Sequence, residues 1–178
     1  MSRRLRVVLR RESTADRDTI RSLTARAFEG LSFSDRSEPL IIDALREAGA
    51  LALSLVAVSR RQVVGHVAFS PVGPLSQSGW FALGPVSVDP SLQRRGVGSR
   101  LIETGLRSLR DQGAKGCVLV GDGRYYHRFG FVGAPALAPP QYPSGHFQVL
   151  RFGESFPHSP VTFHPAFLVR PGGMSGEK

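Results

Sequence analysis

Apolar residues recur along this chain with two different periods, and the clearest helical period lies in the middle of the sequence. From Val97 to Arg110, apolar side chains fall on one side of a helix and charged side chains fall on the other. A second helix is expected after Thr14, which can cap it, and a third after Ser37, which Gly49 ends. The pattern therefore predicts three main helices.

Short apolar runs between these helices predict β-strands. They cover residues 5–10, 52–58, 63–69, 80–88, 117–120, 131–132 and 147–152, with one or two helical turns over 125–129. The second and third runs are separated by Ser59-Arg60-Arg61-Gln62 and predict an antiparallel hairpin. A strand, a long helix and another strand in the middle of the chain predict a parallel βαβ unit. The sheet is therefore expected to be mixed.

The length of 178 residues fits one domain, which we expect to span residues 1–170, with a flexible tail over 171–178. Cys117 is the only cysteine, so the chain can form no internal disulfide. The N-terminal apolar run is too short for a signal peptide, and no stretch approaches the length that spans a bilayer. These features predict a cytoplasmic protein that does not enter a membrane.

The chain carries a formal net charge of +9, almost entirely from arginine. A basic surface attracts nucleic acid, membranes or phosphorylated small molecules. The arginines are spread along the chain without a block of five or six, so they can equally decorate solvated helix faces. Composition alone does not choose between these interpretations.

The turn between the strand at 80–88 and the long helix is rich in glycine and arginine. Gly96 and Gly98 stand where the helix begins, so the backbone can approach a phosphate closely, and the first helical N–H groups have no partner within the helix. These donors and the positive end of the helix form an anion site, beside which Arg94 and Arg95 add charge. The alternative is an ordinary tight turn. Neither a Walker A loop nor a Rossmann fingerprint is present.

Two motifs resemble those of the GNAT acetyltransferases. The pyrophosphate signature of that family, Gln/Arg-x-x-Gly-x-Gly/Ala, is met by Gln93, Gly96 and Gly98, between an apolar strand and an amphipathic helix. The segment Tyr126-His127-Arg128-Phe129-Gly130-Phe131 is similar to the family's Tyr-x-x-x-Gly-Phe. Three further stretches, at residues 64–72, 83–88 and 165–167, resemble a subgroup of uncharacterised predicted N-acetyltransferases. The resemblance extends over residues 5–167.

The resemblance implies the GNAT fold, a mixed and mostly antiparallel sheet with splayed parallel central strands and flanking helices. Acetyl-CoA would lie as the co-substrate in the gap between the fourth and fifth strands. The residues implied to bind it are Val86, Ser87 and Val88 along the pantetheine arm, and Arg94, Arg95, Gly96, Val97, Gly98 and Ser99 around the pyrophosphate. Neutralising the phosphates of coenzyme A would give the basic surplus one use.

The implied activity is direct transfer of the acetyl group from acetyl-CoA to a primary amine, without an acyl-enzyme. An alkylammonium has a pKa of roughly 10, so the amine must lose a proton before it can attack. A backbone N–H of Val86–Val88 would polarise the thioester carbonyl, and Tyr126 would protonate the departing thiolate. The sequence identifies neither the amine nor the base, and it leaves a monomer and a homodimer open.

Two other functions are compatible with the same residues. One is a coenzyme-A-binding sensor or partner domain that has lost turnover, and the other is an enzyme that its basic face brings to RNA. The intact Tyr126 favours turnover, although an aromatic residue at this position can also be simple packing. Tyr125, Phe129 and Phe131 are expected in the core.

The histidines and two acidic residues have structural interpretations. His66 is expected to be a satisfied packing histidine that shares a strand face with Val64 and Ala68. The other histidines have no metal-ligand spacing, which predicts no metal site. Asp35 and Glu38 lie where substrate-facing loops of the family run, although Glu38 equally suits a helix N-terminus.

Overall fold

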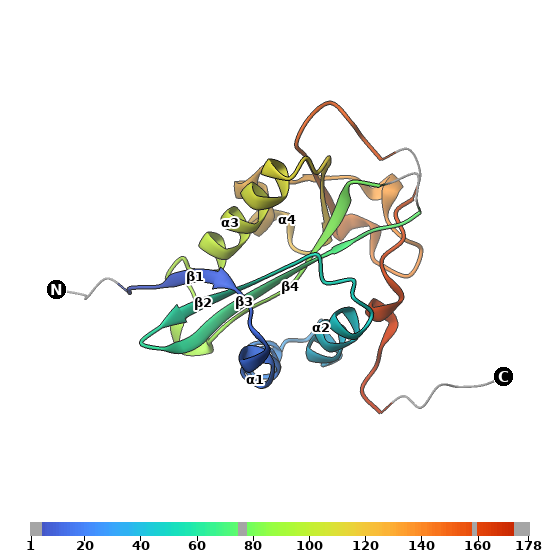
Figure 1. The fold of residues 1–178 in the computed structure, drawn as a ribbon. Coiled ribbons are helices and arrows are strands. Elements are labelled where there is room, and N and C mark those ends of the chain that lie inside the picture. The colour runs from blue at the N-terminus through green and yellow to red at the C-terminus, as the bar shows by residue number, and fades with distance from the viewer. Residues whose placement is uncertain (1–4, 75–77, 158–159, 173–178) are drawn as a thin grey trace.

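The computed structural model describes residues 5–74, 78–157 and 160–172, which contain a seven-stranded sheet of order β1-β2-β3-β4-β5-β7-β6 (Figure 1). The strands are β1 (Val8–Arg11), β2 (Leu53–Ser59), β3 (Gln62–Pro71), β4 (Trp80–Val88), β5 (Gly116–Val120), β6 (Val132–Gly133) and β7 (Phe147–Arg151). Neighbouring strands are antiparallel except β4 and β5, which are parallel. The mixed, mostly antiparallel sheet that the sequence predicts is therefore confirmed.

Helices cover both faces of this sheet (Figure 1). On one face lie α3 (Val97–Asp111) and the short α4 (Gly123–Tyr126), and on the other lie α1 (Arg17–Phe28) and α2 (Glu38–Glu47). The chain passes from β4 through α3 to the parallel strand β5, which forms the expected βαβ unit. The structure is thus three layers, with β4 and β5 in the middle one.

Buried apolar side chains attach the helices to the sheet. The apolar stripe of α3, which includes Leu101 and Ile102, packs on strands β2 to β4, and Gly105 lies directly against the ring of Phe69. A Cβ atom at Gly105 would overlap that ring, so the small residue sets how closely α3 approaches the sheet. On the opposite face, Ile20 of α1 and Ile42 of α2 pack against β2.

Two β-bulges interrupt the alternation of side chains. The register between β2 and β3 shifts at Ala57 and Val58, which leaves Val64 as an extra residue in β3. The register between β3 and β4 shifts beside Gly84 and Pro85, where Gly84 has a φ of 132°. A bulge bends its strand and increases the local twist. The second bulge therefore bends β4 in its middle.

The parallel strands separate at this second bulge. Their pairing ends where Ala82 faces Val118, although β4 continues to Val88 and β5 continues to Val120. Pro85 has no N–H to donate to a neighbouring strand, so it cannot extend the pairing. The splay of the central strands that the resemblance implied is present in the structure.

The structure corrects some boundaries expected from the sequence. β1 begins at Val8 rather than at residue 5, and α1 begins at Arg17, because residues 14–16 form a 3-10 turn. The Asp16 carboxylate fixes that turn by accepting a hydrogen bond from the Ser13 N–H at 2.6 Å. The β2–β3 hairpin closes through Arg60 and Arg61 alone, both with positive φ, as tight hairpin turns require.

Two further observations concern the C-terminal tail and the possibility of a membrane span. Most of the tail expected over 171–178 lies outside the described residues, because the structure describes the C-terminal segment only as far as Gly172. None of the helices in the described ranges combines the length and the apolar character needed to cross a membrane.

Candidate active site

The edge of β4 that faces β5 is open beyond the point where the two strands separate. The N–H of Asp89 donates to the carbonyl of Val64 in β3 at 2.9 Å. Successive residues of a strand direct their main-chain groups to alternate edges, so Val88 and Val86 direct theirs toward the gap, and Ser87 directs its own toward β3. The side-chain amide of Gln93 donates to the Val88 carbonyl at 3.3 Å. The main-chain N–H and carbonyl of Val86 face the gap.

The loop after β4 presents a series of free main-chain donors. Asp89 caps a 3-10 turn over residues 90–92, and the chain then reaches α3 through Arg94 and Gly96, whose φ values are 61° and 81°. The first helical bond is donated by the Arg100 N–H to the Gly96 carbonyl. None of the described residues accepts a hydrogen bond from the main-chain N–H groups of residues 94–99. These donors converge at the positive end of a fifteen-residue helix.

Gly98 leaves room between this loop and α4. A Cβ atom at Gly98 would lie 3.3 Å from the hydroxyl oxygen of Tyr125 and 3.5 Å from the Cγ2 atom of Val88. Val97, by contrast, points inward and is buried against the sheet, and Ser99 is half-buried. The predicted pyrophosphate residues therefore form one continuous loop, of which Val97 anchors the helix and Gly98 borders the gap.

Arginine side chains surround the outer end of the loop. Arg94 and Arg95 are exposed, and neither has a carboxylate within ion-pair distance among the described residues. A cavity beside the loop is lined by Leu5, Arg6, Ser59, Arg60, Gln62, Val64, Leu92 and Arg95. Three arginines from three separate segments therefore meet at this cavity and give it a positive charge.

The two tyrosines of α4 have different surroundings. Tyr126 packs its ring against those of Phe129 and Phe131, with centroids 6.4 and 5.9 Å apart. Burial raises the pKa of Tyr126 well above its ordinary value, so the phenol stays protonated. Tyr125, which was expected in the core, is half-buried and places its hydroxyl beside Gly98. Both side chains thus lie on the β5 side of the gap, and the sequence missed the position of Tyr125.

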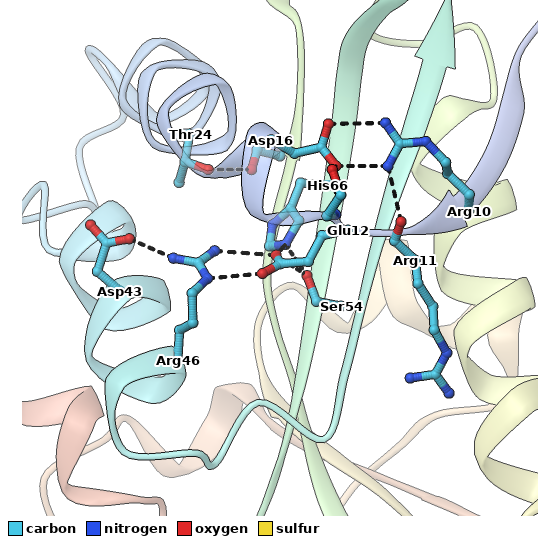
Figure 2. Close-up of polar contacts among 11 residues, drawn as sticks. Arg10, Arg11, Glu12, Asp16, Thr24, Asp43, Arg46, Ser54 and His66 are labelled. Atoms are coloured by element: carbon cyan, nitrogen blue, oxygen red, sulfur yellow. Dashed lines mark hydrogen bonds and ion pairs between the residues drawn. The ribbon is translucent and has the colours of Figure 1, made fainter.

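A network of buried and half-buried polar side chains lies on the opposite face of the sheet, under α1 and α2 (Figure 2). Glu12, immediately after β1, receives hydrogen bonds from Arg46 Nε at 2.8 Å and from Arg46 Nη2 at 3.1 Å. Ser54 of β2 donates to the same carboxylate, and His66 of β3 lies 2.8 Å from Ser54. Arg46 also donates to Asp43 at 2.7 Å. No pattern in the sequence indicates this network, because its members come from four separate segments.

The structure corrects the expectation that His66 and Val64 share one face of their strand. Val64 belongs to the apolar cluster under α3, whereas His66 faces α1 and α2, because the bulge at Val64 shifts the alternation by one residue. The residue of β4 opposite His66 is Ser87, whose hydroxyl lies 2.8 Å from that of Thr24 in α1. His66 is therefore next to the strand whose other edge borders the gap.

The two acidic residues of the α1–α2 loop have local partners. Asp35 forms an ion pair with Arg170 of the C-terminal segment at 2.9 Å, and Glu38 accepts a hydrogen bond from Ser34 at 2.8 Å. Burial opposes ionisation of Asp35, but hydrogen bonds from Ser37 and the charge of Arg170 outweigh it and lower its pKa. Asp35 thus connects two segments that lie far apart in the sequence.

This fold, with its splayed central strands and glycine-rich donor loop, places the chain in the GNAT acetyltransferase family, whose pattern matches residues 17–131. The uncharacterized N-acetyltransferase YhbS of Escherichia coli is 39% identical over 127 residues, which are 70% of this chain and 73% of YhbS. The sequence-based assignment to this family, and the resemblance to its uncharacterised N-acetyltransferases, are therefore confirmed.

Solved structures agree with this assignment. A GNAT family acetyltransferase from Brucella melitensis in complex with acetyl-CoA has 45% identity and a TM-score of 0.81, covering 91% of this chain and 98% of that one. The structure of YhbS from Escherichia coli in complex with CoA has 32% identity and a TM-score of 0.82, and covers 99% of both chains. The chain is thus similar to both proteins over nearly its whole length.

Proposed function

We propose that this protein transfers the acetyl group of acetyl-CoA directly to a primary amine, within a ternary complex. The observation that carries the proposal is the series of free main-chain N–H groups over residues 94–99, next to the open edge of β4. Several donors at one helix start fit a pyrophosphate, and an unpaired strand edge fits the amide groups of a pantetheine arm. Two similar proteins bind acetyl-CoA or CoA in their crystal structures, which supports the same ligand here.

Each part of the loop and strand would serve one part of the ligand. The main chain of Val86 and Val88 would pair with the pantetheine arm, while Ser87 would hold β4 against β3 and α1. The loop from Arg94 to Ser99 would bind the pyrophosphate, with Arg94 and Arg95 contributing charge. The open N–H of Val86 would donate to the thioester carbonyl, where negative charge develops during attack.

Tyr126 would supply the proton that the departing thiolate needs. Its phenol is protonated at pH 7 even at the ordinary pKa of about 10, and burial raises that pKa further. A neutral phenol can donate a proton as negative charge develops on a nearby sulfur. We place the reaction in the cytoplasm, because the single cysteine allows no internal disulfide of the kind that an oxidising compartment favours.

Ligand stabilisation and thiol release test the proposal together. Acetyl-CoA should raise the melting temperature by mass action, whereas ATP and NAD at equal concentration should raise it much less. A panel of primary amines should then release free coenzyme A thiol, and the product should be an N-acetylated amine by mass spectrometry. Equal stabilisation by ATP would indicate a generic nucleotide site. Stabilisation by acetyl-CoA without thiol release for any amine would favour the sensor domain.

A further inference from the structure

One nitrogen of the His66 ring is buried without a hydrogen-bond partner in the part of the chain that the structure describes. The side chain is fully buried, and Nε2 lies 2.8 Å from the hydroxyl of Ser54. No described residue forms a hydrogen bond with Nδ1. Buried polar atoms of native proteins almost always have a partner, so an exception requires an explanation, such as a bound water or a catalytic role.

The hydrogen bonds around His66 fix which ring nitrogen carries the proton. Burial opposes ionisation of Glu12, but the nearby His66 ring and the hydrogen bonds from Arg46 and Ser54 outweigh it and hold its pKa far below the usual range. Glu12 is therefore a carboxylate, which can only accept, so the single hydroxyl proton of Ser54 points to it. The Ser54 oxygen must then accept from Nε2–H of His66. This leaves Nδ1 as a bare acceptor.

Burial and the charge of Arg46 keep the resting ring neutral, whereas the Glu12 carboxylate favours its protonated form. Burial lowers the pKa of His66, and the Glu12 carboxylate opposes that effect. Glu12 Oε2 lies 3.6 Å from Nε2, close enough to stabilise an imidazolium once it forms. Arg46 and Asp43 balance the charge of Glu12, and Arg21 balances Asp43. No other charged side chain among the described residues lies within ion-pair distance of the ring.

The free nitrogen faces away from the network that holds the ring. Ser54 belongs to β2, on one side of β3, whereas β4 lies on the other side, with Ser87 opposite His66. The two nitrogens of an imidazole point to different sides of the ring, so Nδ1 is directed away from Ser54. The unpaired Nδ1 is therefore available to accept a hydrogen bond from a water on the side of the ring that faces away from Ser54.

We propose that His66 accepts the proton that the amine substrate releases, through a water molecule at Nδ1, with Ser54 and Glu12 as positioning residues. The inference rests on the proposed acetyl transfer. An N–H bond of the ammonium breaks and its proton passes to the water, which gives a proton to Nδ1. The amine keeps the electron pair and becomes the nucleophile. The imidazolium, held by Ser54 and Glu12, later returns its proton to solvent.

The decisive experiment is the pH dependence of kcat/KM in wild type and in the His66→Gln variant. Glutamine retains a donor toward Ser54 but removes the base. The probes are Nα-acetyl-lysine amide, whose amine has a pKa of about 10.4, and alanine amide, whose amine has a pKa of about 8. At pH 7 the variant should lose about 30-fold or more in kcat/KM, while its affinity for acetyl-CoA in isothermal titration stays unchanged.

The loss should diminish as the pH approaches the pKa of each amine, because the unprotonated amine then comes from solution. It should therefore diminish at a lower pH for alanine amide than for the lysine derivative. The matched control is His146→Gln, an exposed histidine whose removal should leave both profiles unchanged. A loss that is equal at every pH would show a structural role and overturn the inference. Absence of thiol release from the wild type with every amine would instead contradict the proposed function itself.

The ring tautomer supplies a second measurement that needs no substrate. Nitrogen-15 NMR of the imidazole should show His66 neutral near pH 7, with its proton on Nε2. The difference between wild-type and His66→Gln spectra assigns the signal. A proton on Nδ1 would contradict the hydrogen-bond directions and overturn the inference, even if acetyl transfer is observed.

Discussion

The gap between β4 and β5 and the polar network on the α1 and α2 face of the sheet are built on opposite principles. At the gap with β5, the loop over residues 94–99 offers main-chain N–H groups that have no acceptor among the described residues, beside the exposed Arg94 and Arg95. Under α1 and α2, the network of Glu12, Arg46, Ser54 and His66 uses buried and half-buried side chains whose charges balance. A main-chain site depends on glycines and on space, whereas a side-chain network depends on each of its members. Substitutions should therefore affect the two regions in different ways, binding in one and stability or proton transfer in the other.

The largest effect is expected at Gly98. In Gly98→Glu, a side chain and a negative charge would meet the pyrophosphate, so acetyl-CoA affinity should fall by about 100-fold or more. The residue has ordinary helical backbone angles, and its nearest neighbours are the tip of Tyr125 and a methyl group of Val88, so the variant should fold. Isothermal titration measures the affinity, and circular dichroism checks the fold.

Gly153→Glu is the matched control for this substitution. Gly153 is exposed, and a Cβ atom there would have no neighbour within 4 Å among the described residues. The same change of charge far from the loop should leave acetyl-CoA binding intact. Unchanged affinity in a folded Gly98→Glu variant would contradict the assignment of the loop to the pyrophosphate.

Tyr126→Phe should lower turnover by about 100-fold, because it removes the proposed proton donor and preserves the ring that packs on Phe131. Acetyl-CoA affinity and stability should change little. The structure sharpens the comparison with Tyr125→Phe, since the Tyr125 hydroxyl borders Gly98. That variant should lose a few-fold in affinity and keep its turnover. Pre-steady-state measurement of thiol release gives the turnover of both the Tyr126→Phe and the Tyr125→Phe variants. Full turnover in Tyr126→Phe, where chemistry limits the rate, would make Tyr126 a packing residue.

The polar network under α1 and α2 should contribute to the free energy of unfolding. Glu12→Gln leaves Arg46 with Asp43 as its remaining carboxylate partner and should lower the free energy of unfolding at pH 7 by about 2 kcal/mol. The pKa of Glu12 is held low in the folded state, so its contribution is present above pH 5 and is lost as the pH falls. The difference between wild type and variant in urea unfolding should therefore shrink between pH 5 and pH 3.

The control for this prediction is Asp122→Asn. Asp122 forms an exposed ion pair with Arg124, so its loss should leave the stability unchanged at either pH. A Glu12→Gln variant with the same pH dependence as the wild type would show that other carboxylates with lowered pKa values, Asp16 above all, dominate acid unfolding.

The contrast between the two regions also explains what the sequence could predict. The donor loop is one contiguous stretch of sequence, so the spacing of its glycines between a strand and a helix is enough to predict its conformation. The network joins Glu12 to His66, which are far apart in the sequence, and no periodic pattern of residues predicts such a contact. The bulge at Val64 also moved His66 to the other face, because a pattern of alternation cannot show an inserted residue.

The smallest effect is expected at Arg95, whose exposed side chain lines the cavity beside the donor loop. Arg95→Ala should weaken acetyl-CoA binding by only about three- to tenfold in 50 mM salt, because the main-chain donors remain and a solvated charge contributes little. At 500 mM salt the difference should nearly vanish, since the ions screen the attraction between Arg95 and phosphate. Arg107→Ala, an equally exposed arginine on the polar face of α3, should have no effect at either salt concentration. Isothermal titration at both concentrations separates the outcomes: equal affinity of wild type and Arg95→Ala in low salt would make Arg95 a solvated surface charge and leave phosphate binding to the main chain alone.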